Sequence, residues 1–191
     1  AALPRFHSRT SARQAAKETP EVNVQAPAHG RKAVLFATCF ANYNDPAISL
    51  DARAVLALNG VETEVVYPGC CGMPQLENGD IEAVAASAKK TTAELTPWIE
   101  KGYDVIALVS SCALMMKFEW PLILPSDEAI ESLSRATFDI AEYVAGMAAK
   151  EGLADGMKPL EGGVSIHLPC HARAQNMGPK AAEMLRLIPD T

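Results

Sequence analysis

The sequence predicts an α/β fold in three layers, with a parallel sheet of about four strands and helices on both of its faces. Short apolar runs of strand length alternate four times with longer segments whose apolar residues recur at helical spacing. Glycine, proline, asparagine and aspartate residues separate these segments where turns and helix ends need them. Such alternation produces right-handed βαβ units and therefore a parallel sheet.

The first unit begins at residue 33. The continuous apolar run 33–37 predicts a buried strand. Asp45 is a suitable N-cap and Pro46 a suitable first residue for the helix that follows, and Gly60 is expected to end it. The β-branched and aromatic run 63–67 then predicts the second strand.

The pattern continues towards the C-terminus. Residues 78–80 open a second long helix, and the apolar run 105–109 predicts the third strand. Ser126 is expected to cap a single long helix that Gly152 closes. The run 164–168 predicts the fourth strand, and a last helix starts at Gly178-Pro179. Residues 1–32 are polar and lack periodicity, so we expect a solvated linker or tail there.

The composition limits the classes of function. Of the 191 residues, 49% are hydrophobic, enough for a core in one domain or slightly more. With 21% charged residues and a net charge of −6, the chain lacks the basic character typical of proteins whose main partner is nucleic acid or an anionic membrane. It contains no apolar stretch of membrane-spanning length and no secretory signal, so we expect it to be cytoplasmic.

Cysteines follow three of the predicted strands. Cys39 comes after the first, Cys70 and Cys71 after the second, and Cys112 after the third. Ligand sites in open α/β sheets form at the carboxyl ends of the strands, so the four thiols are expected at one edge. Four thiolates are the usual ligand set of iron–sulfur clusters and of structural zinc. Buried cysteines that only pack, or a redox disulfide between Cys39 and Cys112, are the alternatives.

The adjacent pair Cys70-Cys71 favours a cluster over a single ion. Neighbouring side chains of an extended segment point apart, so both thiols reach one centre only from a turned backbone. Gly69 and Gly72 flank the pair and permit such a turn. A multi-iron cluster, whose iron atoms are spread over several ångströms, accommodates neighbouring ligands more naturally than zinc does.

Three short motifs carry a resemblance to a known family. They are Cys39-Phe40-Ala41-Asn42-Tyr43-Asn44, Cys70-Cys71-Gly72-Met73-Pro74, and Ser110-Ser111-Cys112 followed by Glu119-Trp120-Pro121. Their order and spacing resemble the CCG-type cysteine-rich domain of heterodisulfide reductase and of the iron–sulfur subunits of glycolate and lactate oxidation systems. The resemblance looks strongest to the iron–sulfur subunit of anaerobic glycerol-3-phosphate dehydrogenase.

The resemblance implies an iron–sulfur cluster, of the [4Fe–4S] type, on Cys39, Cys70, Cys71 and Cys112. The family's fullest form uses five cysteines around a noncubane cluster. Here Val109 stands in the place of one of them, so a conventional four-thiolate cluster is an alternative. Zinc is the other alternative for the metal.

The resemblance also implies a role. The chain would be an electron-transfer component of an oxidoreductase complex rather than its substrate-binding subunit. It would accept electrons from a flavoprotein dehydrogenase acting on glycerol 3-phosphate or a 2-hydroxy acid, and pass them towards a quinone at the inner face of the membrane. A cluster enzyme that cleaves disulfides, like heterodisulfide reductase, and a structural zinc scaffold are the alternatives.

The family has two such motifs in tandem. His167-Leu168-Pro169-Cys170-His171 is similar to the opening of the second, with Cys170 as the first ligand of an incomplete second site. We therefore expect residues 33–160 to form a first CCG domain, residues 161–191 to begin a truncated second one, and the chain to be part of a longer protein.

Four other residues near the cysteines have two interpretations each, and a fifth has one. Asn42 and Tyr43 either hydrogen-bond near the cluster or shape the turn before the helix. His167 and His171 are either ligands or, more commonly for such positions, packed and hydrogen-bonded side chains. Lys117 is expected on a solvated face.

Overall fold

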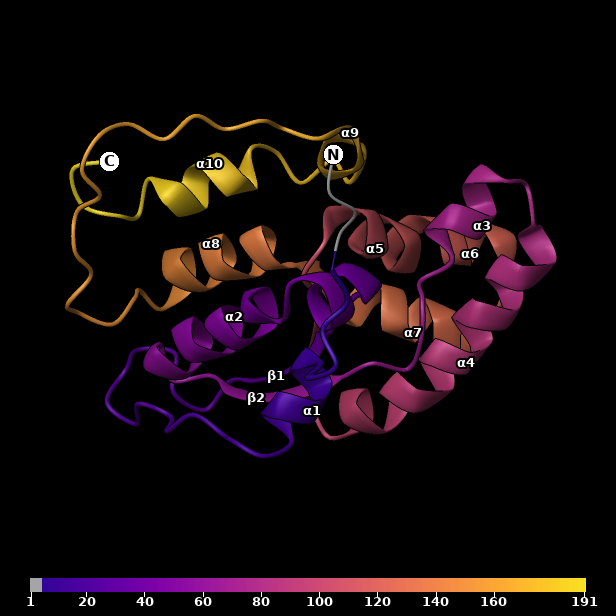
Figure 1. Cartoon of the computed structure of the whole chain (residues 1–191), viewed down its shortest axis with the longest axis horizontal. Helices are drawn as coiled ribbons and strands as arrows, with labels where there is room; N and C mark the ends of the chain where they lie inside the picture. The colour runs from indigo at the N-terminus through magenta and orange to yellow at the C-terminus, as the bar shows by residue number, and fades with distance from the viewer. Residues whose placement is uncertain (1–4) are drawn as a thin grey trace.

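The computed structural model describes residues 5–191, and its centre is a sheet of four parallel strands (Figure 1). The strands are β1 (Lys32–Phe36), β2 (Glu62–Val66), β3 (Asp104–Ala107) and β4 (Thr137–Asp139), in the order β2-β1-β3-β4. Every neighbouring pair is parallel, and helices cover both faces. The predicted three-layer α/β fold is confirmed.

The helices follow the local signals of the sequence in most places. Their bounds are α1 Ser11–Ala15, α2 Pro46–Leu58, α3 Met73–Glu77, α4 Ile81–Glu100, α5 Ser110–Leu114, α6 Trp120–Ile123, α7 Glu128–Ala136, α8 Ile140–Lys150, α9 Cys170–Ala174 and α10 Lys180–Leu185, with π-helical turns η1 at Phe40–Asn44 and η2 at Met115–Glu119. Pro46 is the first residue of α2, as predicted. Asp80 caps α4 by accepting a hydrogen bond from the backbone N–H of Ala83.

The alternation of side chains along the strands divides the core into two. Val34 and Phe36 of β1 face a cluster that includes residues of α4, α5, η2, α6 and α7. Ala33 and Leu35 face the opposite cluster, which includes residues of α2 and α8. Both faces of β1 are fully buried, which explains why its sequence is a continuous apolar run.

The fourth strand lies elsewhere than predicted. Residues 164–168 are exposed and lie outside the sheet, and β4 instead interrupts what the sequence predicted as one helix from Ser126 to Gly152. The segment Thr137-Phe138-Asp139 pairs with β3, where its β-branched and aromatic residues are favoured. Asp139 then forms a capping box that starts α8. The prediction of a single helix is wrong because pairing with β3 and a second cap divide it.

The N-terminal segment packs on the domain rather than lying in solvent. Ser11 and Ala15 of α1 are buried. The buried guanidinium of Arg53 donates to the backbone oxygens of Ala15 at 2.9 Å and Glu18 at 2.7 Å. The expectation of a solvated tail is therefore wrong for residues around α1.

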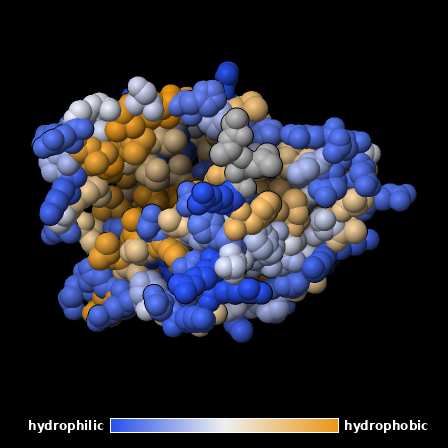
Figure 2. Space-filling model, viewed as in Figure 1, coloured by the Kyte–Doolittle hydropathy of each residue, from blue (hydrophilic) through white to orange (hydrophobic). Residues whose placement is uncertain are grey.

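At the other end, α9 contacts α5 and α10 contacts α8. The segment between α8 and α9 runs over the surface without helix or strand, and several of its apolar residues are exposed, among them Leu160, Val164 and Ile166. Figure 2 shows apolar residues gathered in a hollow over α8 and α10.

Whether residues 161–191 begin a second domain stays a prediction. Among the described residues, no helix combines the length and apolar character that crossing a membrane requires.

Candidate metal centre

The carboxyl ends of β1, β2 and β3 deliver the four cysteines to one edge of the sheet. Cys39 lies between β1 and η1, Cys70 and Cys71 lie in the loop between β2 and α3, and Cys112 lies in α5. Because these three strands are neighbours in the sheet, their following loops are neighbours too. The thiols form a series of contacts, from Cys39 to Cys70, then to Cys71, then to Cys112.

These contacts and burial disfavour the thiolate forms while no cation is present. Burial raises the pKa of the Cys39 thiol. The contact with Cys71 raises the pKa of Cys70 well above its usual range, and the contact with Cys112 raises the pKa of Cys71 to about 12. Thiolates this close repel each other unless a positive centre lies between them. The site is therefore one that a bound metal centre would stabilise.

The Cys70-Cys71 pair sits in a tight turn. Gly72 has a φ of 87°, and a Cβ there would lie 3.4 Å from the Cα of Val84. Its backbone N–H donates to Sγ of Cys70 at 3.5 Å. The turn that the flanking glycines predicted is confirmed, and it lets adjacent thiols contact different neighbours in the series.

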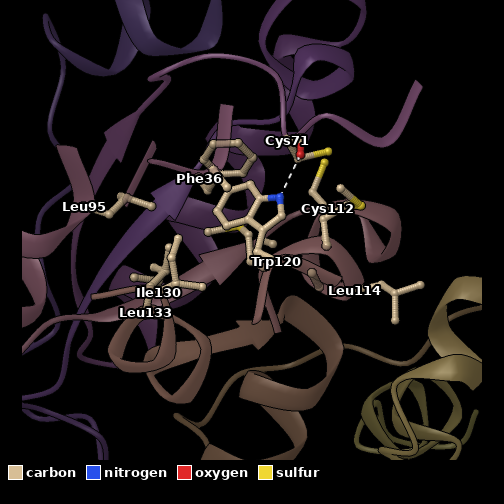
Figure 3. Close-up of a cluster of buried hydrophobic side chains, with 14 of the residues drawn as sticks. Phe36, Cys71, Leu95, Cys112, Leu114, Trp120, Ile130 and Leu133 are labelled. Carbon is tan, nitrogen blue, oxygen red and sulfur yellow. Dashed lines mark hydrogen bonds between the residues drawn. The ribbon is translucent and has the colours of Figure 1, made fainter. Parts of the chain in front are cut away.

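The inner side of the centre is closed by the apolar core. Cys71 and Cys112 are buried, and Figure 3 shows their sulfur atoms pointing toward one another. The indole Nε1 of Trp120, a fully buried side chain, donates to the backbone oxygen of Cys71 at 3.1 Å. Val109, in the place of a family cysteine, packs against the same core and precedes α5. The core therefore shields two of the four thiols, those of Cys71 and Cys112, from water.

The outer side is more open. Cys39 and Cys70 are half-buried. The hydroxyl of Tyr67 lies 3.2 Å from Sγ of Cys39, and the ring of Tyr43 packs edge-on against that of Tyr67 at 5.3 Å between centroids. The sequence alone assigned no role to Tyr67. The indication that it offers is the position of Tyr67 at the end of the predicted strand 63–67, three residues before Cys70.

Asn42 and Lys117, two polar residues in the elements that follow Cys39 and Cys112, have hydrogen-bond partners other than those predicted. Asn42 is turned to the N-terminal segment, where its Oδ1 accepts hydrogen bonds from Ser11 Oγ and the backbone N–H of Ala12. Lys117 forms an ion pair with Glu142 at 2.6 Å, so its placement on a solvated face is wrong. That pair ties η2 to α8, because a mostly buried ammonium needs a carboxylate partner.

The residues of the predicted second motif lie apart from the series of thiols. Cys170 is exposed at the start of α9, and His167 is exposed as well. Nδ1 of His171 lies 2.7 Å from the hydroxyl of Ser111, next to Cys112 in the chain. The hydrogen-bonded interpretation of His171 therefore agrees with the structure, and Cys170 as a ligand of a second site stays a prediction.

The four thiols fit an iron–sulfur cluster in kind and number. Among the described residues, no three His, Cys, Asp or Glu side chains are grouped closely enough to hold a single metal ion. Structural zinc needs its ligands around one point, whereas each iron of a cluster takes its own thiolate. The donor set is therefore one that an iron–sulfur cluster would use, and the assignment of Cys39, Cys70, Cys71 and Cys112 as its ligands stays a prediction.

Comparison with known proteins finds relatives of this chain at the level of sequence. Residues 33–117 match the model of the cysteine-rich domain called CCG. The chain is 29% identical to a subunit of the anaerobic glycerol-3-phosphate dehydrogenase of Escherichia coli over 170 residues, which cover 88% of this chain and 42% of the relative. It is 24% identical to lactate utilization protein A of Bacillus cereus over 147 residues, 73% of this chain and 57% of the relative.

The chain thus spans about two fifths of the length of the E. coli relative. No solved structure matches it significantly. The matched segment contains β1, β2 and β3 together with Cys39, Cys70, Cys71 and Cys112. The predicted bounds of the first domain, residues 33–160, stay a prediction. The segment 33–117 of this chain belongs to the CCG cysteine-rich domain family.

Proposed function

We propose that this chain holds an iron–sulfur cluster on Cys39, Cys70, Cys71 and Cys112 and transfers electrons as part of an oxidoreductase. The observation that carries the proposal is the series of thiol contacts at the ends of three adjacent strands. A cluster bound there would supply one-electron transfer. The family match and the names of the two relatives, a dehydrogenase subunit and a lactate utilization protein, support the assignment.

The residues around the thiols suit this role. The rigid strand ends hold the ligands with little ordering on binding. Hydrogen bonds from Gly72 and, where its hydroxyl donates, Tyr67 would stabilise the negative charge on Cys70 and Cys39 and so adjust the reduction potential. The buried thiols of Cys71 and Cys112 would shield one side from water, and the half-buried pair would face a redox partner.

The partners and the cluster type are finer parts of the same proposal. We take the electron donor to be a flavoprotein dehydrogenase subunit and the acceptor to be a quinone, with the chain at the inner face of the membrane. These assignments rest on the family resemblance and on the dehydrogenase name of the E. coli relative. We take the cluster to be [4Fe–4S], as the family resemblance implies, and four thiolates are a ligand set that such a cluster uses.

The test is anaerobic purification followed by iron, sulfide and zinc analysis and a visible spectrum of the same sample. We expect about four iron and four sulfide per chain, and a broad absorption at about 400 nm that dithionite bleaches. About one zinc per chain without colour would replace the proposal by a structural zinc site. No metal, even after reconstitution with iron and sulfide, would refute both.

A further inference from the structure

A pocket of about 350 Å³ opens beside the candidate metal centre. It forms where the N-terminal segment crosses η1 and the residue that follows β2. Its lining includes Tyr67, whose hydroxyl lies 3.2 Å from Sγ of Cys39. The pocket and the surroundings of Cys39 therefore share the side chain of Tyr67.

The described lining of the pocket contains one formal positive charge, that of Arg13. Arg13 contributes a guanidinium and His7 an imidazole, and none of the described lining residues is acidic. One guanidinium nitrogen of Arg13 donates weakly to the backbone oxygen of Ser8 at 3.3 Å, which leaves most of its five N–H groups for a ligand. Guanidinium groups bind carboxylate and phosphate oxygens in a fork geometry.

A further amide donor lies in the same wall. Asn42 is only 2% exposed and lines the pocket. Its Oδ1 accepts two hydrogen bonds, from Ser11 and Ala12, while its NH₂ group has no acceptor among the described residues. This amide is therefore available to donate to a molecule in the pocket. The hydroxyl of Tyr43 adds a further donor to the lining.

We propose that this pocket binds a small oxyanion, the carboxylate or phosphate group of a small molecule, beside Cys39. Arg13 supplies the positive charge, and the amide of Asn42 and the hydroxyl of Tyr43 supply neutral donors. The pocket is built by the protein alone, so the inference does not require the cluster. It goes beyond electron transfer, because the chain itself would then bind an organic molecule next to its redox centre.

The test is NMR titration of the full ¹⁵N-labelled chain at constant ionic strength. Acetate represents the carboxylate arm, inorganic phosphate the phosphate arm, and acetamide is the uncharged counterpart of acetate. We expect saturable shifts of the backbone amides of Ser8, Arg13 and Tyr43 with at least one anion and none with acetamide. The anion that binds more tightly identifies the class of ligand.

Two variants and one control assign the site. Arg13→Gln should weaken binding about tenfold, because a charge-assisted bidentate contact is lost. Tyr43→Phe removes only a hydroxyl and should weaken binding by about three- to fivefold. Arg9→Gln, an exposed change in the same segment outside the pocket, should leave the affinity unchanged.

Three results would overturn the inference: no saturable shift with either anion, equal shifts with acetamide, or an unchanged affinity in both Arg13→Gln and Tyr43→Phe. The unshifted amide signals of Ser11 and Ala15 in each variant check that α1 still packs on the domain. Iron content is measured in parallel and should be the same in Arg13→Gln as in the parent. The proposal of an anion site and the proposal of a cluster can therefore be refuted independently.

Discussion

The indole of Trp120 donates a hydrogen bond to the backbone oxygen of Cys71 at 3.1 Å, from a side chain that is fully buried (Figure 3). The bond links the apolar core beneath the sheet to the turn that presents Cys70 and Cys71. It satisfies a carbonyl that the turn leaves without a strand or helix partner. The position of the two thiols therefore depends on the packing of one aromatic residue 49 positions later in the chain.

Trp120→Phe keeps most of the ring volume and removes this bond. We expect the free energy of unfolding to fall by about 1–3 kcal/mol, because the Cys71 carbonyl loses its partner and a small void opens. The iron retained after reconstitution should fall as well. Urea denaturation and iron analysis measure the two effects. Trp98→Phe, at a half-buried residue whose ring packs against Tyr103, is the matched control. Equal losses in both variants would contradict a specific role for Trp120.

Serine substitutions of the four candidate ligands should each lower the iron content, because a hydroxyl is a poor substitute for a soft thiolate. We expect less than about half of the parent iron after anaerobic reconstitution of Cys39→Ser, Cys70→Ser, Cys71→Ser or Cys112→Ser. Cys170→Ser is the control, since Cys170 is exposed and outside the series of contacts. Iron loss in Cys170→Ser comparable to that in Cys39→Ser would mean that the ligand set is wrongly assigned.

Val109→Cys restores the thiol that the family's fullest motif has at this position. Val109 directly precedes α5 and lies three residues before Cys112, so its side chain is carried by the same turn. We expect an added donor to slow the loss of the absorption at about 400 nm in air by at least about threefold. Val109→Ala has a similarly small side chain without sulfur and should not slow it. An unchanged rate in the cysteine variant would show that residue 109 cannot reach the centre.

Arg53→Met should release the N-terminal segment. The guanidinium donates to the backbone oxygens of Ala15, Glu18 and Thr63, and methionine leaves these without a donor. We expect a loss of about 2–4 kcal/mol of stability, the range for removing several buried hydrogen bonds from a charged donor. Limited trypsin digestion should then cleave at Arg13 and Lys17 sooner than in the parent. Arg135→Met, at an exposed helix position, should change neither quantity.

The stability of the metal-free chain should fall in alkaline solution. The contact with Cys112 raises the pKa of Cys71 from an ordinary 9.0 to about 12. A group whose pKa is raised by folding stabilises the protein fully below its unfolded value and loses that contribution as the pH rises through the folded value. We therefore expect the melting temperature to decline between about pH 9 and pH 12.

Cys71→Ala provides the comparison for this pH dependence. This variant should be less stable than the parent at neutral pH, because the substitution leaves a small cavity. Its melting temperature should decline less above about pH 9. Melting curves followed by circular dichroism in matched buffers give the slope of melting temperature against pH for each protein. Equal slopes for the two proteins would show that Cys71 does not cause the alkaline loss of stability.

Local sequence determined the elements whose signals lie within a few residues. The apolar run of β1 is continuous because both of its faces are buried, and Pro46 and Asp80 start their helices by properties of their own side chains. The placement of the cysteines was predictable for the same reason. Once strands and helices alternate in a parallel sheet, residues that follow successive strands meet at one edge.

Tertiary contacts decided the rest. The segment 164–168 has the composition of a strand but lies exposed outside the sheet, whereas Thr137–Asp139 becomes β4 within a helical pattern because β3 offers it a partner. The contacts of Arg53 with the N-terminal segment and of Tyr67 with Cys39 join residues about 28 to 38 positions apart. Periodicity reports which face a residue shows to the core, but hydrogen-bond partners of that separation exist only after the chain has folded, and no local pattern encodes them.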